Sequence, residues 1–160
     1  MKTLSRAPKQ LGDFGEGLVT YLLIRNGFEV AVVDHVGADL IAEKDGQRFA
    51  ISVKTRLFRE GSKESRAFVI ENTHLEKLEH FANTFGLKSI YAQVVCLADD
   101  KKIHICALTM DFIEKLNVGK YVYCLRMQKK TDLLRLSNEA FLYACLHEER
   151  MRTTDISTAV

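Results

Sequence analysis

Hydrophobic residues recur along the chain at spacings that predict an alternation of helices and strands. An apolar stripe at helical spacing over residues 13–26 predicts a first helix. Residues 28–34 are apolar on both faces of an extended chain, which predicts a covered strand in the middle of a sheet. A β-hairpin follows, with one arm over residues 39–42 and the other over residues 48–55. This order of elements is typical of an α/β domain.

The second half of the chain continues the alternation. We expect residues 67–70 to extend the same sheet. The sequence Thr73-His74-Leu75-Glu76 has the pattern of a capping box, so a second helix is expected from there until Gly86 stops it. The remaining expected elements are strands over residues 89–98, 102–108 and 121–125, a short helix over 110–116, and a last helix from Ser137 to about residue 150.

Composition indicates a single globular domain. The 160 residues are 47% hydrophobic and 28% charged, and a chain of this length buries roughly 70% of its unfolded surface, enough for a core. No internal repeat and no linker rich in Gly or Pro interrupts it. We therefore interpret residues 1–160 as one domain, with a basic arm over residues 1–10, a C-terminal embellishment over 119–150 and a polar tail over 151–160.

Cysteine usage and the lack of targeting signals point to a reducing compartment. Cys96, Cys106, Cys124 and Cys145 lack the spacing of a zinc site, so we expect free thiols. No segment is apolar over the length needed to span a membrane, and no signal peptide is visible. The sequence therefore predicts a cytoplasmic protein without a membrane partner.

The expected hairpin gathers three polar side chains on one patch. Its centre carries Asp45-Gly46, a dipeptide that favours a two-residue turn. Counting outward from this turn places Asp39 directly across from Ser52. Side chains alternate along a strand, so Lys54 points to the same side as Ser52. A carboxylate, a hydroxyl and an ammonium group are thereby brought together, an arrangement that suits a metal-dependent phosphodiesterase.

Three motifs in this part of the chain occur in the order of a known family. They are Gly15-Glu16 in the first helix, Gly37-Ala38-Asp39-Leu40 at a strand start, and Val53-Lys54-Thr55-Arg56 in the next strand. The chain resembles the PD-(D/E)xK nuclease superfamily and, within it, the branch of Holliday junction resolvases. The resemblance implies a restriction-endonuclease-like α/β core, in which a mixed β-sheet is flanked by helices. It is specific over residues 12–56.

The resemblance also implies a role for each motif residue. Asp39 and Glu16 would hold a divalent ion, Mg²⁺ or Mn²⁺, together with the backbone carbonyl of Val53. Lys54 would orient the attacking water and stabilise charge developing on the phosphate. Ser52 departs from the family, which places Glu, Asp or Gln there, and its neutral hydroxyl would assist only weakly. The expected activity is metal-dependent hydrolysis of DNA phosphodiester bonds.

Several of these residues also have a structural explanation. Asp39 could cap a turn. If Asp13 is the N-cap of the first helix, Glu16 is its N3 residue, and the two form a capping box that needs no catalysis. A lysine such as Lys54 is common on edge strands, where it prevents aggregation.

The serine at position 52 leaves two functions open. With Glu16 as a second carboxylate, magnesium binding remains chemically feasible. In the alternative, catalysis has lapsed, and the fold binds nucleic acid or a protein partner without cleavage. Asp34 or Glu71 could supply, from another position in the chain, the acid that is missing at Ser52.

Basic residues follow the candidate catalytic strand. The net charge is only +2, yet residues 54–66 hold five basic and two acidic side chains. The residues expected to contact a nucleic-acid backbone are Arg56, Arg59, Lys63 and Arg66, with a solvated loop as the alternative. No motif that reads base sequence is visible, so we expect recognition of shape, as in branched DNA. RNA stays open as a substrate, and the resemblance further implies a homodimer.

Overall fold

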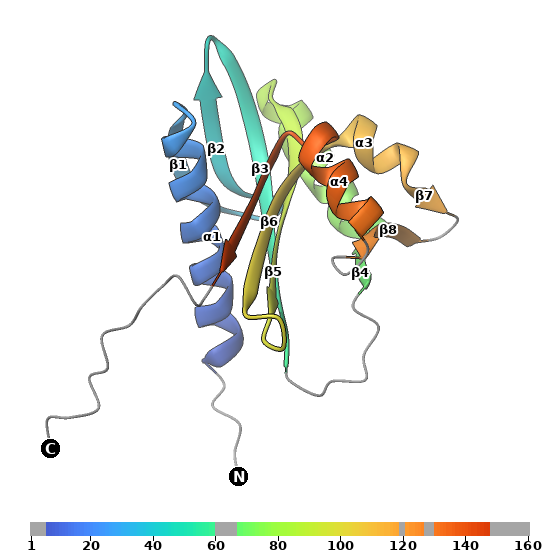
Figure 1. The fold of residues 1–160 in the computed structure, drawn as a ribbon. Coiled ribbons are helices and arrows are strands. Elements are labelled where there is room, and N and C mark those ends of the chain that lie inside the picture. The colour runs from blue at the N-terminus through green and yellow to red at the C-terminus, as the bar shows by residue number, and fades with distance from the viewer. Residues whose placement is uncertain (1–5, 60–66, 119–120, 127–129, 148–160) are drawn as a thin grey trace, which may run out of the picture.

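The computed structural model describes residues 6–59, 67–118, 121–126 and 130–147 (Figure 1). In chain order the described elements are α1 (Ala7–Arg25), β1 (Glu29–His35), β2 (Ala38–Lys44), β3 (Gln47–Phe58), β4 (Ala67–Glu71), α2 (Asn72–Phe85), β5 (Lys88–Leu97), β6 (Lys102–Thr109), α3 (Met110–Lys115), β7 (Asn117–Val118), β8 (Tyr121–Arg126), α4 (Lys130–Glu139) and β9 (Leu142–His147). Within these ranges, no helix is long and apolar enough to cross a membrane.

A six-stranded mixed sheet forms the centre of the molecule, in the order β1-β2-β3-β5-β6-β9. β3 and β5 are parallel, and the crossover between them passes through β4 and α2. The other neighbouring pairs are antiparallel. α1 covers one face of this sheet and α2 the other (Figure 1). The molecule is therefore a mixed α/β structure with β3 and β5 at its centre.

The β2–β3 hairpin forms in the predicted register. Both turn residues, Asp45 and Gly46, have positive φ angles, 53° and 75°, as a type I′ turn requires. From this turn the ladder of paired residues runs to Leu40 and Ile51. The hairpin prediction is confirmed, and each strand extends beyond the predicted arms.

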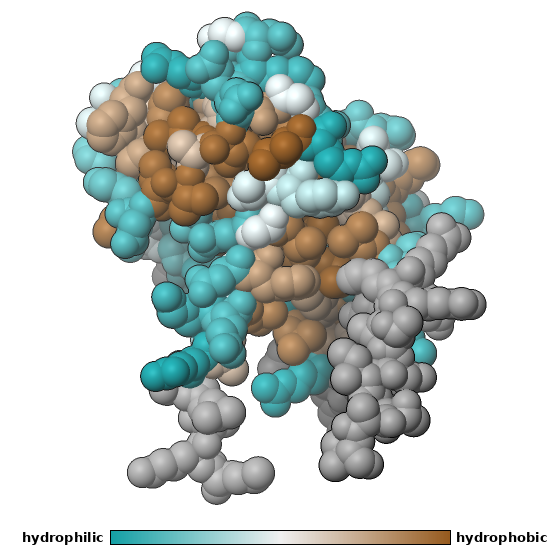
Figure 2. All heavy atoms as spheres, turned by 90° about the vertical axis from the view of Figure 1, so that its left-hand side faces the viewer, coloured by the Kyte–Doolittle hydropathy of each residue, from teal (hydrophilic) through white to brown (hydrophobic). Residues whose placement is uncertain are grey.

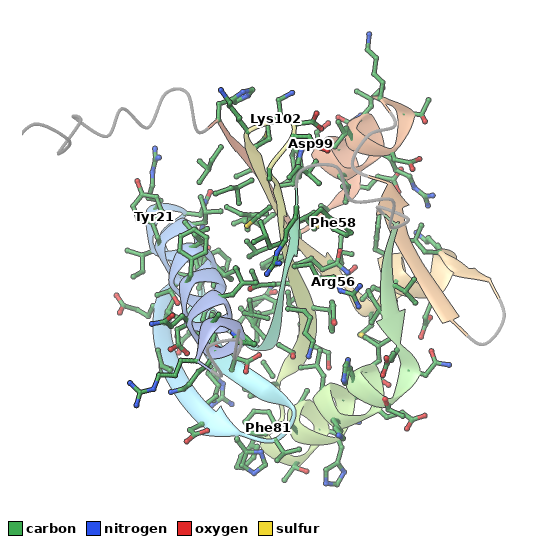
Figure 3. All side chains as sticks on the ribbon, turned by 90° about the horizontal axis from the view of Figure 1, so that it is seen from below. Tyr21, Arg56, Phe58, Phe81, Asp99 and Lys102 are labelled. Atoms are coloured by element: carbon green, nitrogen blue, oxygen red, sulfur yellow. The ribbon has the colours of Figure 1, made fainter. Side chains whose placement is uncertain are left out.

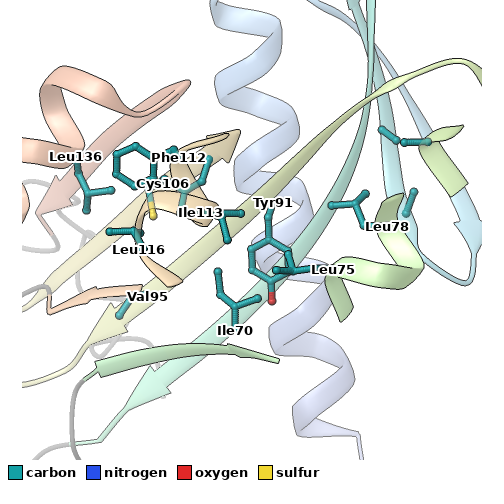
Figure 4. Close-up of a cluster of buried hydrophobic side chains, with 14 of the residues drawn as sticks. Ile70, Leu75, Leu78, Tyr91, Val95, Cys106, Phe112, Ile113, Leu116 and Leu136 are labelled. Atoms are coloured by element: carbon teal, nitrogen blue, oxygen red, sulfur yellow. The ribbon is translucent and has the colours of Figure 1, made fainter. Parts of the chain in front are cut away.

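Two apolar clusters fill the two faces of the sheet. On one face, Val19 and Leu23 of α1 belong to a cluster built on β2, β3, β5 and β6. On the other face, Tyr91 of β5 lies beside Leu75 of α2 and Ile70 of β4 (Figure 4). Since β3 and β5 contribute to both clusters, they hold α1 and α2 in fixed positions on opposite sides of the same strands.

α1 begins six residues earlier than the sequence pattern predicts, at Ala7. Pro8 stands in its first turn, where the missing N–H costs no hydrogen bond and the fixed φ favours a helix. The prediction of a basic arm over residues 1–10 is therefore wrong for residues 7–10. Residues 1–5 lie outside the described part of the chain.

β1 is an edge strand, so the prediction of a central strand covered on both faces is wrong. It pairs with β2 alone among the described strands, and Val32 is 71% exposed. Apolar composition alone favoured burial, but the position of a strand in the sheet is decided by its neighbours.

The small second sheet corrects another expectation. β4 pairs with β8 in a three-stranded sheet of order β4-β8-β7 and does not extend the main sheet. α2 then starts at Asn72, and its N-cap Glu71 makes no side-chain cap bond. The predicted capping box over residues 73–76 is therefore wrong. The predicted stop is confirmed, because Gly86 adopts the left-handed conformation at the C-cap, with φ 64°.

The C-terminal part contains a helix and a strand where one long helix is predicted. α4 ends at Glu139, and β9 pairs antiparallel with β6. The rings of His104 and Tyr143 share a hydrogen bond of 3.1 Å between Nδ1 and the hydroxyl oxygen, which joins β9 to the sheet. Ser137 therefore lies inside a helix and does not cap one. Residues 148–160, including the predicted tail, lie outside the described residues.

The remaining elements agree with the sequence patterns. The strands predicted over 89–98, 102–108 and 121–125 and the helix over 110–116 are confirmed within one residue at each end as β5, β6, β8 and α3. Cys96 and Cys106 are buried free thiols, and Cys145 is a half-buried free thiol. The side chain of Cys124 lies outside the described residues.

Candidate active site

A small cavity of about 130 Å³ opens on the α2 face of the β2–β3 hairpin. Asp39, Ser52 and Lys54 line it from the two strands of the hairpin. Tyr91 of β5 also lines the cavity. The three polar residues that the sequence predicts to meet are thus brought together.

The Asp39 carboxylate is held in place by the facing strand. Its Oδ2 atom accepts a hydrogen bond of 2.6 Å from the Val53 N–H and one of 3.3 Å from the Ser52 hydroxyl. The first bond continues the connection between β2 and β3 just beyond their last paired residues. Asp39 is therefore oriented by β3 and is fixed relative to Lys54. This geometry differs from the turn cap that the sequence leaves open for Asp39.

Ser52 acts here as a donor to the neighbouring carboxylate. Its hydroxyl donates the 3.3 Å hydrogen bond to the Asp39 carboxylate. A carboxylate at this position would lie next to Asp39 and repel it unless a cation stood between the two. The serine thus adds no charge to the site and gives one hydrogen bond to the Asp39 carboxylate.

Lys54 lines the cavity with an exposed side chain. It lies on the same side of β3 as Ser52, as the alternation of side chains along a strand predicts. Its strand lies between β2 and β5, and Lys54 is in register with Gln93 of β5. The ladder to β2 stops at Ile51, so Lys54 has a strand neighbour on one side only among the described residues. The amine is therefore accessible to a ligand in the cavity.

α1 lies close to β3 at Gly15, the residue that precedes Glu16. A Cβ atom added at Gly15 would overlap the Thr55 hydroxyl, so only glycine permits this approach. Burial raises the pKa of the Glu16 carboxyl, and the negative charge of Asp39 is the next largest cause of the increase. Glu16 is thus electrostatically coupled to Asp39, although it does not line the cavity.

The alternative explanation of Glu16 as half of a capping box is wrong. The N-cap of α1 is Arg6, and Asp13 and Glu16 both lie within the helix. A carboxylate two turns or more from the helix start gains little from the helix dipole, which acts within the first turn. The position of Glu16 is therefore unexplained by helix capping.

The second wall of the cavity comes from α2, which sequence reasoning missed. His74 and Lys77 line the cavity one helical turn apart on the same side of α2. Gly37 allows this approach: it has φ 110°, and a Cβ there would collide with the backbone carbonyl of Lys77. The i, i+3 spacing of His74 and Lys77 is the feature of the sequence that predicts a shared helix face. Nothing local connected it to Asp39.

Asp34 and Glu71, the two acids that the sequence leaves as possible further metal ligands, lie outside the cavity. Asp34 lies on β1, and its charge also contributes to the raised pKa of Glu16. Glu71 is the exposed N-cap of α2. Within the described residues, no group of three or more His, Cys, Asp or Glu side chains is arranged to hold a metal ion. Any ion at Asp39 would need backbone, water or substrate oxygens as well.

Two of the four predicted backbone-contacting residues are described. Arg56 and Arg59 are exposed and line a larger apolar groove between β3 and the start of α1. Arg56 and Phe58 are labelled along β3 in Figure 3. Phe58 is 3% exposed and belongs to the core. Lys63 and Arg66 lie outside the described side chains.

The arrangement of sheet, helices and hairpin is that of a restriction-endonuclease-like fold. The structure is similar to the Holliday junction resolvase Hjc of Archaeoglobus fulgidus, with a TM-score of 0.50 and 21% identity, over 70% of this chain and 81% of that one. A bacterial homing endonuclease, I-Ssp6803I, matches with a TM-score of 0.45 and 17% identity, over 76% and 78% of the two chains. No family model and no curated protein matches the sequence.

Proposed function

We propose that this protein is a metal-dependent endonuclease that hydrolyses DNA phosphodiester bonds. The observation that carries the proposal is the meeting of Asp39 and Lys54 in one cavity, with the Asp39 carboxylate fixed by the backbone of β3. A positioned carboxylate next to an accessible ammonium group, on this fold, suits the binding of a phosphate and a divalent ion. The cytoplasm, where its substrate would be found, is the expected compartment.

The donors at the site fit one divalent ion held by few protein ligands. Asp39 would hold Mg²⁺ or Mn²⁺ together with the Val53 carbonyl and the Glu16 carboxylate. Magnesium usually keeps several waters and takes one or two carboxylates plus substrate phosphate, so a dedicated cage is unnecessary. When bound, the ion would supply an acidified water and stabilise negative charge on the phosphate. The electrostatic coupling of Glu16 to Asp39 supports this set.

The chain's own residues would divide the remaining work. The Val53 N–H and the Ser52 hydroxyl keep Asp39 oriented without a reorganisation cost at the moment of reaction. Lys54 would hold a phosphate oxygen and orient the attacking water. Its ammonium group would act as a point charge.

Branched DNA is the substrate that we propose. No motif that reads base sequence accompanies the site, and the exposed Arg56 and Arg59 suit contacts to phosphates. A two-fold homodimer would place two sites on two strands of a junction. RNA is the alternative substrate, because the same chemistry cleaves both polymers.

A second candidate function is a nucleic-acid-binding or partner-binding module that does not cleave. The observation that favours it is the Ser52 hydroxyl, which takes the place of an acidic side chain and donates to Asp39. With one carboxylate in the cavity, metal affinity would be low, and binding through the basic residues would persist.

Cleavage of a labelled panel separates the two candidates. The panel contains a four-way junction, a flap, a single strand, a duplex and an RNA duplex, each tested with Mg²⁺ and with Mn²⁺. A nuclease cuts at least one substrate only with metal, and Asp39→Asn abolishes the cutting. Absence of cleavage by the wild type, with binding that weakens as salt rises, contradicts the proposal and supports the binding module. In that case Ser52→Glu tests whether one carboxylate restores activity.

A further inference from the structure

A second, larger cavity lies on the α1 side of β3. It is a groove with a volume of about 590 Å³, within the range of about 300–1,000 Å³ that is common for pockets holding small organic groups. Leu11 and Phe14 line it from α1, and Leu57 lines it from β3. Apolar side chains gather on this side of the molecule, the side that carries α1 and β1 (Figure 2).

The groove exposes apolar surface and carries positive charge at one end. Phe14 is 43% exposed and Leu57 is 47% exposed, so both side chains have surface available to a ligand. Arg59 lines the same groove, and Arg56 alternates with Leu57, so its side chain points to the face of β3 that carries the Asp39 cavity. An apolar floor next to a guanidinium group complements a flat aromatic group joined to an anion. A nucleotide has this combination of a base and a phosphate.

The groove and the Asp39 cavity lie on the same projecting part of β3. β2 pairs with β3 only as far as Ile51, so residues 52–58 have β5 as their one strand neighbour in the described sheet. Lys54 lines the cavity on one face of β3, and Leu57 lines the groove on the other face. Their Cα atoms are three residues apart, which is about 10 Å at the rise of a strand. One polynucleotide strand crossing the open edge of β3 could therefore reach both.

We infer that this groove binds an unstacked nucleobase of the strand whose phosphate occupies the Asp39 cavity. Phe14 stacks on the base, Leu57 closes the apolar side, and Arg59, with Arg56 on the other face of β3, contacts the flanking phosphates. The inference rests on the proposed nucleic-acid function and adds the substrate class: a strand with an unpaired nucleotide close to the bound phosphate. Bases inside a continuous duplex are stacked and paired, and extracting one costs a few kcal/mol. The groove would therefore favour branch points, bulges and single strands.

Equilibrium binding without divalent metal tests the inference separately from cleavage. The probes are a duplex with one unpaired 2-aminopurine and a fully paired duplex of equal length. The wild type should prefer the unpaired probe and change its fluorescence. Phe14→Ala should weaken binding of the unpaired probe by roughly 5- to 150-fold, the range for loss of one aromatic stacking partner, and Leu57→Ala should weaken it by less. Both variants should leave the affinity for paired duplex unchanged.

Tyr21→Ala is the matched control, because Tyr21 is an aromatic residue of α1 that is 53% exposed and does not line the groove. It should bind both probes as the wild type does. Phe14→Trp preserves a stacking surface and should retain the preference. Urea unfolding of each variant confirms that it is folded, and the half-exposed positions make large losses of stability unexpected.

The outcomes distinguish the occupants of the groove. Equal loss on both probes, or no loss in Phe14→Ala, overturns the inference. A wild-type dimer that dissociates in Phe14→Ala, with probe preference unchanged, also overturns it and assigns the groove to a second copy of the chain. Retained preference in a wild type that cleaves nothing leaves the inference standing while the nuclease proposal fails. Cleavage without any preference for unpaired bases supports the nuclease proposal and overturns the inference about the groove.

Discussion

The two halves of β3 belong to one strand but are built differently. Its first half lies between β2 and β5, and Phe49, Ala50 and Ile51 are at most 6% exposed. Its second half pairs with β5 and projects past the end of the β2 ladder. There the side chains line a polar cavity and an apolar groove. The candidate site therefore lies where β3 no longer pairs with β2. The buried first half of the strand, paired on both sides, holds this projecting part in place.

The largest effect is expected at Lys54, in the projecting half. Lys54→Met should reduce cleavage by roughly 10²- to 10³-fold, because a preorganised cation at the phosphate is lost. Its free energy of unfolding should change by no more than about 0.5 kcal/mol, because the side chain is exposed. Initial rates and urea denaturation on the same preparation test both statements. A large stability loss would contradict the division of β3 into two halves.

The reverse pattern is expected at Ile51, in the paired half. Ile51 is fully buried, so Ile51→Ala should lower the free energy of unfolding by about 2–5 kcal/mol. The rate per folded molecule should stay close to that of the wild type at a temperature where the variant remains folded. A catalytic defect as large as that of Lys54→Met would show that the paired half takes part directly in the site.

A smaller effect is expected where α1 meets the projecting half. Gly15→Ala should cost about 1–3 kcal/mol of stability, because the new methyl group collides with Thr55 on a strand that cannot retreat. Cleavage should fall as well, because Glu16 moves away from Asp39. Thermal unfolding and cleavage rates measure the two effects.

Gly17→Ala is the control for that substitution. It lies on the same helix, and a Cβ there meets no atom within 4 Å. Alanine is the better helix former, so this variant should gain up to about 1 kcal/mol. Equal effects at the two glycines would show that helix propensity, and not the approach to Thr55, dominates at position 15.

The smallest effect concerns pH. The folded protein raises the pKa of Glu16, so between the ordinary and the raised value the folded state keeps a proton that the unfolded state has released. Stability therefore falls as the pH rises through this window. Glu16→Gln cannot ionise and should be relatively more stable than the wild type above the window, by less than about 1 kcal/mol because solvent screens the site. Urea midpoints at several pH values test the sign, and parallel curves for the two proteins would contradict it.

The sequence could predict the hairpin and its three polar residues because that information is local. The Asp45-Gly46 turn sets the register, and the register sets which side chains face each other. His74 and Lys77 could not be placed in the same way. They reach the cavity through a crossover between parallel strands and the close approach of α2 at Gly37, and neither contact is written in a short stretch of sequence.

The wrong predictions have a common physical cause. Residues 142–147 form a short apolar run, and periodicity alone cannot tell a buried helix from a strand in such a run. Pairing with β6 decides the matter in favour of β9. β1 is the converse case, because its apolar sequence predicts the centre of the sheet while the strand order leaves it at the edge. In both cases a distant partner determines the outcome.

The parallel pairing of β3 and β5 also determines when the site can form during synthesis. The β2–β3 hairpin can close as soon as its two strands exist, because its contacts are local. The cavity needs α2 and β5 as well, so it cannot be completed before the chain has been made to Leu97. Until then the apolar residues of β3 lack one neighbour, and such exposed strands favour aggregation. The candidate active site is therefore expected to be a late and slow product of folding, limited by a non-local contact between parallel strands.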